Sequence, residues 1–371
     1  MVEKLVSSID SVYIHQQSKD APVTSRILKL FPTSKIQWVE DDSALTNKDK
    51  PLSSQEYSDS KKKLYITPFK GQFFKRCPGA SQRKALTCCN YYVLNLGLQC
   101  NMNCSYCYLQ SYLTTPVMTI FSNIDDALAE LNEISLEHGS KHIRVGTGEV
   151  IDSLSLDPIT HYSHSLIKFF SQQTHWKLEF KTKSHHVDQF LDCDHRGNVI
   201  VSWSINPQAV IEKEEHGTAS LEERLQAAEK CARRGFPIAF HMDPMIYHEN
   251  WKANYEDLIQ ELSSRFRHVD VQGISVGTLR FQPEQRHMMR ERFGMKSWVT
   301  QAEVFLSDSG KLRYDSKLRT NMFKFAVDRF KHHSPWPVTI CMETPETWIA
   351  TYEKLPTQMA ELKSLFQPVR L

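Results

Sequence analysis

The sequence contains no apolar run that approaches the roughly 18 residues needed for a membrane-spanning helix. Its opening residues, Met1 to Val6, are too polar for the core of a secretory signal. Net charge is only +2 over 371 residues, so any nucleic-acid contact must come from a local basic patch. With no secretory signal, the nine cysteines are not expected to build a disulfide scaffold. We therefore expect a protein of the reduced cytoplasm, without a membrane partner.

Three of these cysteines lie close together, at Cys100, Cys104 and Cys107, directly after the apolar run 91–98. That run is typical of a short buried strand, so the cysteines are expected on the loop that leaves it. Cysteine thiolates hold iron–sulfur clusters, usually four per cubane, and three would leave one iron open to a small molecule. A zinc site or buried structural cysteines are the alternatives, but zinc usually takes four ligands in paired sets and no second pair follows. The spacing C-x3-C-x2-C is similar to that of radical S-adenosylmethionine (SAM) enzymes, in which SAM fills the open site.

The loop Cys104-Ser105-Tyr106-Cys107-Tyr108-Leu109-Gln110 resembles the cluster loop of the spore photoproduct lyase family, and the resemblance extends over residues 10–350. It implies a radical SAM lyase with two cofactors, a 4Fe–4S cluster and SAM. The cluster would cleave SAM reductively, and the 5′-deoxyadenosyl radical would then take hydrogen from a damaged pyrimidine and reverse the lesion. Implied partners are lesion-containing DNA and an electron donor such as flavodoxin or ferredoxin.

Short apolar segments alternate with helical ones from the cluster strand to about residue 276. This alternation predicts βαβ units with a parallel sheet, and the resemblance implies an α/β fold with a partial (β/α)6 TIM-like barrel. The polar composition after the first strands indicates a linker. The expected domains are an N-terminal α/β extension over 1–40, a polar linker over 41–75, the partial barrel over 76–285, and a C-terminal basic hairpin with helices over 286–371.

Barrel folds carry their functional residues at the C-terminal ends of strands, where this sequence repeatedly places polar residues. Gly146-Thr147-Gly148-Glu149 is similar to the radical SAM glycine-rich motif, in which backbone and a carboxylate hold the SAM amino group; glycine allows close approach. Lys183 resembles the family lysine that meets the SAM carboxylate, and Ser204-Ile205-Asn206 resembles the family Ser-x-Asn. Without the resemblance these would be ordinary turn residues. The SAM-binding residues are thus expected to be Gly146, Gly148, Glu149, Lys183, Ser204 and Asn206.

One position departs from the family. The resemblance implies a hydrogen-donor cysteine just after the second strand, and that position is occupied by Gly146. The tyrosines that the family couples to it are present as Tyr106 and Tyr108, which are the expected catalytic residues. Packing around the cluster is their alternative role. Either a tyrosine donates the hydrogen, or another cysteine such as Cys231 does, or the substrate differs.

A basic segment follows the expected barrel. Between Lys311 and Lys331 there are seven Lys or Arg and two Asp, with aromatic residues interleaved. Basic charge attracts phosphate and aromatic side chains stack on bases, so this hairpin region is the candidate DNA contact. An ordinary basic amphipathic helix is the alternative. The expected nucleic-acid contacts are Arg280, Lys311, Arg313, Tyr314, Lys317 and Arg319.

Four further cysteines, Cys77, Cys88, Cys89 and Cys341, would suit buried packing or, alternatively, a second cluster. Lys61-Lys62-Lys63 is expected to be a solvated charge run. Three functions remain open at this level: a radical SAM lyase acting on DNA, a radical SAM enzyme that modifies RNA or another substrate, and a non-catalytic iron–sulfur protein. The SAM-motif residues weigh against the third.

Overall fold

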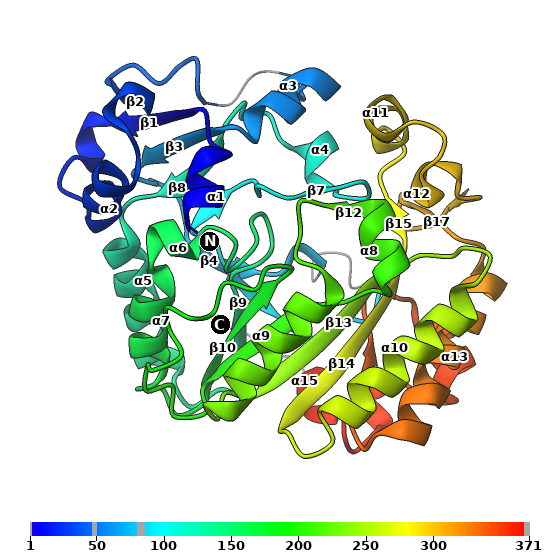
Figure 1. Cartoon of the computed structure of the whole chain (residues 1–371). Helices are drawn as coiled ribbons and strands as arrows, with labels where there is room; N and C mark the ends of the chain where they lie inside the picture. Colours follow the sequence, from blue (N-terminus) through cyan, green and yellow to red (C-terminus); the bar gives the residue numbers. More distant parts are fainter. Residues whose placement is uncertain (1, 47–49, 80–85, 367–371) are drawn as a thin grey trace.

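The computed structural model describes residues 2–46, 50–79 and 86–366, and its centre is one curled sheet of eight strands (Figure 1). Seven strands are parallel, and only β4 runs antiparallel to its neighbour β5. The alternation of strands and helices predicted the parallel sheet, and the family resemblance implied the partial barrel; both are confirmed. In spatial order the strands are β18 (Val338–Ile340), β14 (Val271–Thr278), β13 (Ile238–Met245), β11 (Val199–Ser204), β10 (Trp176–Thr182), β9 (Ile143–Gly146), β5 (Tyr92–Leu94) and β4 (Phe74–Arg76).

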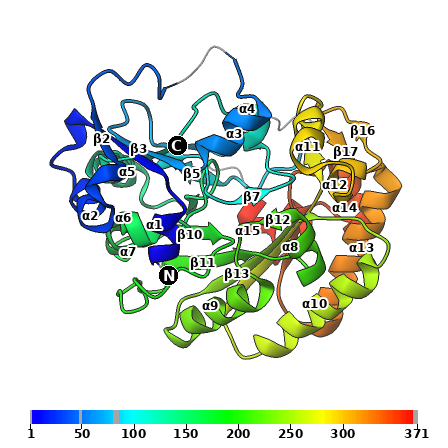
Figure 2. The same cartoon turned by 45° about the horizontal axis from the view of Figure 1, so that its top comes forward.

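Helices cover the outer face of this sheet, as Figures 1 and 2 show. A buried apolar side on each helix packs against the strands: α9, for example, begins at a Ser220–Glu223 capping box and buries Leu225 and Ala228. The connection 183–198 between β10 and β11 contains no regular helix. The outer helices are α5 (Ile124–His138), α6 (Asp157–Thr160), α7 (Tyr162–Phe170), α9 (Leu221–Arg233), α10 (Trp251–Arg265) and α13 (Ser316–His333).

A second sheet lies beside the barrel, and it is not confined to the expected N-terminal extension. Its strands come from the N-terminus and from the segment around the cluster loop. The N-terminal strands therefore share a sheet and a core with the region expected to be barrel. In spatial order they are β2 (Ile36–Val39), β1 (Ser11–His15), β3 (Lys63–Thr67), β8 (Met118–Phe121) and β6 (Gly97–Leu98), with α1 (Val2–Ser7) and α2 (Pro22–Leu30) packed nearby.

The prediction of a polar linker over 41–75 needs correction. Helix α3 (Ser54–Ser60) lies within it, begins at a capping box formed by Ser53 and Glu56, and buries Tyr57 completely. Strands β3 and β4 also fall in this range. Mean composition hid these elements, because a capped helix and one apolar strand are averaged away in a Ser- and Lys-rich window.

The C-terminal hairpin is confirmed. Strands β16 (Phe305–Leu306) and β17 (Leu312–Arg313) pair antiparallel, and β17 also pairs with β15 (Arg280–Phe281). The hairpin is therefore attached to the end of β14 rather than free. The remaining elements are α4 (Leu109–Tyr112), β7 (Asn103–Cys104), α8 (Gln208–Glu214), β12 (Glu215–His216), α11 (Gln285–Phe293), α12 (Trp298–Gln301), α14 (Pro345–Tyr352) and α15 (Lys363–Phe366).

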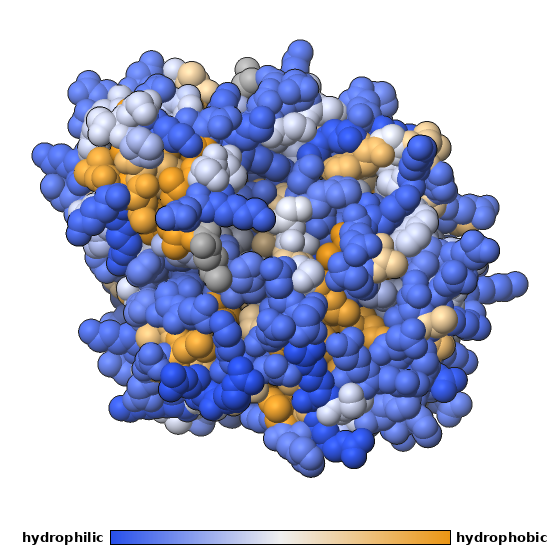
Figure 3. All heavy atoms as spheres, viewed as in Figure 1, coloured by the Kyte–Doolittle hydropathy of each residue, from blue (hydrophilic) through white to orange (hydrophobic). Residues whose placement is uncertain are grey.

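Figure 3 shows a largely hydrophilic face, with apolar patches over the N-terminal elements and near the centre between α9 and α10. In the part of the chain that the structure describes, no helix has the length and apolar character required to span a bilayer.

Candidate active site

The three cluster cysteines lie on a loop that runs between β6 and α4. Cys104 is 7% exposed and belongs to β7, which pairs with β12, the segment that follows β11 and α8. Burial, then the charge of Asp152, raises the pKa of the Cys100 thiol to about 11, and Cys107 adds to the shift. Burial also raises the pKa of Cys104, with further contributions from Cys107 and Cys100. The thiols are thus close enough to influence one another.

The donor set suits a cluster better than a single ion. All three cysteines have free thiols. Among residues 2–46, 50–79 and 86–366, no group of three or more His, Cys, Asp or Glu side chains is arranged around one metal ion. A cubane binds each thiolate through a different iron, so its ligands need not converge on one point. The loop therefore fits a 4Fe–4S cluster that is ligated by Cys100, Cys104 and Cys107.

Residues outside the loop hold it in place. Lys61 Nζ donates hydrogen bonds to the carbonyl oxygens of Cys100, at 2.7 Å, and Met102, at 2.6 Å. Its ammonium lies 4.7 Å from the ring centroid of Tyr57, whose hydroxyl is 3.8 Å from Cys107 Sγ. Lys61 was expected to be solvated, and that expectation is wrong: helix α3 points it at the cluster loop.

Helix α11 contacts the same loop from the C-terminal side. Arg292 donates to Gln110 Oε1 at 2.7 Å and to the Asn103 side chain. Gln285 Nε2 donates to the backbone oxygen of Cys107 at 3.0 Å. The sequence offered no signal for these contacts, because 182 residues separate Arg292 from Gln110.

Glu149 follows β9 on the loop that carries the glycine motif. Its Oε2 atom is buried and has no hydrogen-bond partner, and burial raises the pKa of the carboxyl group, with Lys75 opposing. A buried carboxylate oxygen without a partner is suited to a cationic ligand such as the SAM ammonium. The Tyr108 hydroxyl donates to the backbone oxygen of Glu149 at 2.8 Å, which ties this loop to the cluster loop.

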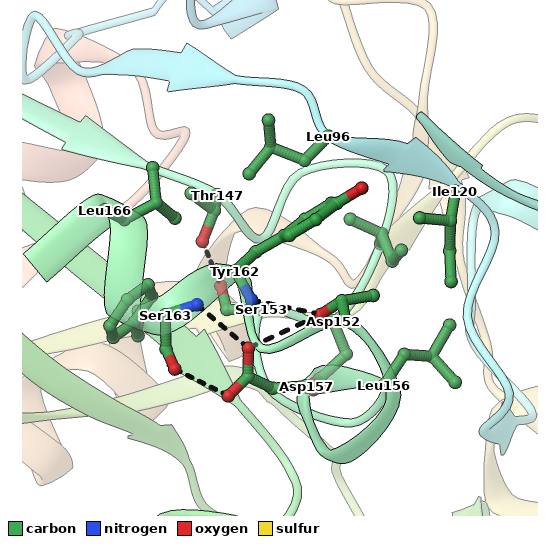
Figure 4. Close-up of a pocket in the computed structure, with 13 residues that line it drawn as sticks. Leu96, Ile120, Thr147, Asp152, Ser153, Leu156, Asp157, Tyr162, Ser163 and Leu166 are labelled. Carbon is green, nitrogen blue, oxygen red and sulfur yellow. Dashed lines mark hydrogen bonds between the residues drawn. The ribbon is translucent and has the colours of Figure 1, made fainter. Parts of the chain in front are cut away.

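Close packing around position 148 explains why this residue is a glycine. A Cβ atom there would lie 2.9 Å from the Lys181 backbone oxygen and 3.0 Å from Ser153 Oγ. Behind this loop is a small cavity of about 30 Å³, which Figure 4 shows. Its polar groups pair with one another, as in the 2.8 Å hydrogen bond between Thr147 and Ser153 and the 2.7 Å bond between Ser163 and Asp157. The cavity therefore supports the loop and offers no unpaired group to a ligand.

Lys183, Tyr106 and Glu215 meet between the cluster loop and the end of β10. The Tyr106 hydroxyl donates to Glu215, which also forms a 2.7 Å ion pair with the fully buried Arg224. Burial lowers the pKa of Lys183, but Glu215 and Cys104 outweigh it and the net shift is upward. The Lys183 ammonium lies 5.7 Å from the Tyr106 ring centroid. Lys183 is therefore a cation held beside the cluster loop, where an anionic group of a ligand would be attracted.

A family model, "Spore photoproduct lyase", matches residues 8–310. The chain belongs to the spore photoproduct lyase family. A spore photoproduct lyase of Geobacillus sp. (strain Y412MC61) is 31% identical over 205 residues, which cover 54% of this chain and 60% of that protein. The enzyme of Bacillus subtilis (strain 168) is 28% identical over 256 residues, 68% of this chain and 72% of that protein.

The fold is also shared with solved structures of spore photoproduct lyase. A double mutant "with bound AdoMet and dinucleoside spore photoproduct" superposes with a TM-score of 0.77 at 24% identity, covering 91% of this chain and 99% of that one. A form "complexed with dinucleoside spore photoproduct" gives 0.76 at 24% identity, with coverages of 89% and 98%.

In this spore photoproduct lyase family member, Asn206 lies inside the protein and is hydrogen-bonded there. It is 1% exposed, and its amide donates to Glu215 at 2.9 Å and to the Pro244 oxygen at 3.2 Å, while its Oδ1 accepts from Tyr255 at 2.7 Å. The contact of Asn206 with SAM stays a prediction, and these internal bonds fix the orientation of the amide. Ser204 is also buried, at 3%, and its carbonyl accepts from Arg224 at 2.8 Å.

The barrel interior contains a charged group that the sequence did not reveal as a unit. His241 Nε2 lies 2.7 Å from Glu179 Oε1, and Arg144 Nε lies 3.9 Å from Glu179 Oε2. Burial raises the pKa of Glu179, but His241 and Arg144 together hold it well below its usual range. The three side chains line a small cavity of about 40 Å³ between the strands. In the sequence, the only sign of this group is that each of the three residues directly follows an apolar residue. Such alternation is expected where successive side chains of a strand point to opposite faces of a sheet.

Most of the expected nucleic-acid contacts lie inside the protein. Arg280 is paired with Asp243 through two hydrogen bonds of 2.7 and 2.9 Å. Arg313 is 2% exposed and pairs with Glu343, Tyr314 is 2% exposed, and Arg319 is 9% exposed and also approaches Glu343. These internal partners speak for a structural role of the four residues, and their contact with nucleic acid stays a prediction.

Two lysines of the same set remain available. Lys317 is exposed at the start of α13, and Lys311 is partly exposed on the hairpin. The hairpin also presents Phe305 and Leu306, which are 52% and 68% exposed. The hairpin therefore combines an exposed apolar pair with nearby lysines.

The four other cysteines approach one another at the edge of the barrel. Burial raises the pKa of Cys77 to about 11, with contributions from Cys89 and Cys88. Cys341, which follows β18, is influenced by Cys89 as well. A second cluster on these residues stays a prediction of the sequence.

Proposed function

We propose that this protein is a radical SAM lyase that reverses a damaged pyrimidine in DNA, with the spore photoproduct as the first candidate lesion. The observation that carries the proposal is the arrangement at one end of the partial barrel. There the three thiols of the cluster loop, the unpaired Glu149 oxygen and the Lys183 ammonium lie on neighbouring loops.

The residues divide the binding task among them. Cys100, Cys104 and Cys107 would hold the cluster, which leaves one iron for SAM. Glu149 would bind the SAM ammonium and Lys183 its carboxylate, since each charge is opposite to that of its partner group. When bound, the cluster and SAM together supply a primary carbon radical that takes one hydrogen atom from the substrate. Asn206 acts through Glu215, whose carboxylate it orients.

The tyrosines take positioning roles around this centre. Tyr106 is hydrogen-bonded to Glu215, which also faces Lys183, so it fixes the carboxylate beside the SAM-binding lysine. Tyr108 is hydrogen-bonded to the Glu149 backbone and keeps the amino-group ligand next to the cluster loop. Both are proposed to hold SAM in register with the cluster.

DNA is the proposed partner of the hairpin. Lys311 and Lys317 would neutralise phosphates, and the apolar tip at Phe305 and Leu306 suits insertion between bases. A base must leave the stack before chemistry at one of its carbon atoms is feasible. A low-potential electron donor of the flavodoxin or ferredoxin class is required to reduce the cluster.

The test is an anaerobic assay of cluster-reconstituted protein with SAM, dithionite and an oligonucleotide that carries the spore photoproduct. Thymine recovered in proportion to turnover, together with 5′-deoxyadenosine, supports the lyase. Cys104→Ala should abolish both products, while Cys193→Ala, which is outside the site, should abolish neither. Deoxyadenosine without thymine would assign a different substrate, with RNA the next to be assayed. No deoxyadenosine from the wild type would reject the radical SAM assignment.

A further inference from the structure

The space beside Gly146 is filled by a tyrosine. A Cβ atom placed on Gly146 would lie 2.0 Å from the hydroxyl oxygen of Tyr91 and 2.5 Å from its ring carbons. No side chain fits there unless Tyr91 moves. Register explains the proximity, because Tyr92 of β5 pairs with Val145 of β9 and Val93 pairs with Gly146. The Tyr91 hydroxyl thus stands about where the second atom of a side chain at position 146 would be.

The surroundings keep this phenol protonated and oriented. Its hydroxyl hydrogen-bonds to Glu179, and the Arg144 guanidinium lies 4.9 Å from the ring centroid. Burial and the charge of Glu179 raise the pKa of Tyr91 well above its ordinary value, so the O–H bond is intact at neutral pH. Tyr91 as a residue is partly buried, and its phenol lies among Gly146, Glu179 and Arg144.

We propose that Tyr91 is the hydrogen-atom donor that completes lesion reversal. The inference rests on the proposed function. After one hydrogen atom has been removed from the substrate and the bond of the lesion has broken, the product is a carbon radical. The Tyr91 O–H bond breaks, a C–H bond forms on the product, and a neutral phenoxyl radical remains on Tyr91. One electron from the flavodoxin- or ferredoxin-class donor and one proton, relayed from solvent through His241 and Glu179, restore the phenol.

Other donors fit less well. Cys231 is 0% exposed on α9, which lies outside the barrel, so the sequence-based candidate is corrected. The Tyr106 and Tyr108 hydroxyls are bonded to Glu215 and to the Glu149 backbone oxygen, whereas the Tyr91 hydroxyl is the one that lies beside Gly146. Tyr91 instead directly precedes β5, and its hydroxyl lies beside Gly146 at the end of β9 and contacts Glu179, which lines the interior cavity. Cys89, which contacts Arg144, is the remaining competitor.

The experiment compares wild type, Tyr91→Phe and Cys89→Ala in the lesion assay, with freeze-quenched electron paramagnetic resonance as the second readout. Tyr91→Phe should consume lesion and form deoxyadenosine at normal rates, but thymine per lesion consumed should fall at least tenfold. Wild type should give a phenoxyl signal that narrows when ring-deuterated tyrosine is incorporated, and Tyr91→Phe should lack that signal. Normal thymine yield from Tyr91→Phe, or loss of thymine in Cys89→Ala alone, would overturn the proposal.

A rescue variant separates chemistry from folding. Gly146→Cys alone should be impaired by the clash with Tyr91, and Tyr91→Ala alone should lose the donor. The combined variant provides both the space and a thiol, so it should regain thymine yield over either single change. Failure of the combined variant, with normal lesion binding and thermal unfolding, would count against a donor at this position. If the wild type itself restores no thymine, the proposed function fails and Tyr91 is not at issue.

Discussion

Arg313 forms a 3.0 Å ion pair with Glu343, and each side chain is only 2% exposed. The same arginine donates to the backbone oxygen of Met342 at 2.9 Å. The hairpin strand β17 is thereby fastened to the segment that follows β18. Arg313, which belongs to a basic segment in the sequence, therefore links the hairpin to the barrel.

Arg313→Ala should therefore act on stability. Removing one partner of a buried ion pair leaves an uncompensated charge, which typically costs about 3–5 kcal/mol. Arg319 also approaches Glu343 and would offset part of the loss, so we expect about 3 kcal/mol in urea-induced unfolding. Lys324→Ala, a change at an exposed position of the neighbouring helix α13, is the control. Unchanged stability with a large loss of DNA affinity would contradict the structural role.

Lys311→Ala combined with Lys317→Ala should act on DNA binding instead. Each lysine is at least partly exposed, and each lost phosphate contact lowers the slope of log affinity against log salt by about 1. Fluorescence anisotropy at several salt concentrations would measure a slope reduced by about 2, with little change in unfolding. Lys354→Ala, distant from the hairpin in sequence, provides a control. A slope that stays unchanged would place the phosphate contacts elsewhere.

Lys61→Met should shift the cluster to a more negative reduction potential. Its ammonium contacts two carbonyl groups of the cluster loop, and a nearby cation favours the reduced, more negatively charged cluster. Redox titration followed by electron paramagnetic resonance would detect the shift. Lys61→Arg keeps the charge and should remain close to wild type. If Lys61→Met and wild type had equal reduction potentials, Lys61 would only hold the loop in place and would not tune the cluster.

Acid should weaken the protein partly through Asp243. Burial raises the pKa of this carboxyl, but Arg280 overcomes that effect and lowers it well below its ordinary value. A lowered folded-state pKa contributes stability above the unfolded value of about 4, and the contribution is lost as the pH falls from there. Unfolding free energies measured at pH 7, 5 and 4 should therefore decline more steeply between pH 5 and pH 4 in wild type than in an Asp243→Asn, Arg280→Met variant. Parallel curves would show that the pair does not contribute to acid sensitivity.

Local patterns were sufficient for much of the architecture. The apolar segments of the barrel predicted β9, β10, β11, β13 and β14, because a buried strand requires a short run of apolar and β-branched residues wherever it lies. The hairpin was predicted from the turn residues between its two strands, which are also a local pattern. The spacing of Cys100, Cys104 and Cys107 is also local, since three ligands within eight positions can serve one cluster with little help from the rest of the chain.

Roles that depend on distant partners were decided by the tertiary structure. From the sequence, Lys61 is one member of a charge run, but in the fold it follows α3 and contacts the cluster loop. Arg313 resembles a surface cation in the sequence, but in the fold it is buried against Glu343. From the sequence, Gly146 only lacks the side chain that the family has there. In the fold, strand pairing places the Tyr91 hydroxyl in the space that such a side chain would occupy. In each case the energy of a charged or polar group depends on burial and on a partner far along the chain, and only the folded chain brings those together.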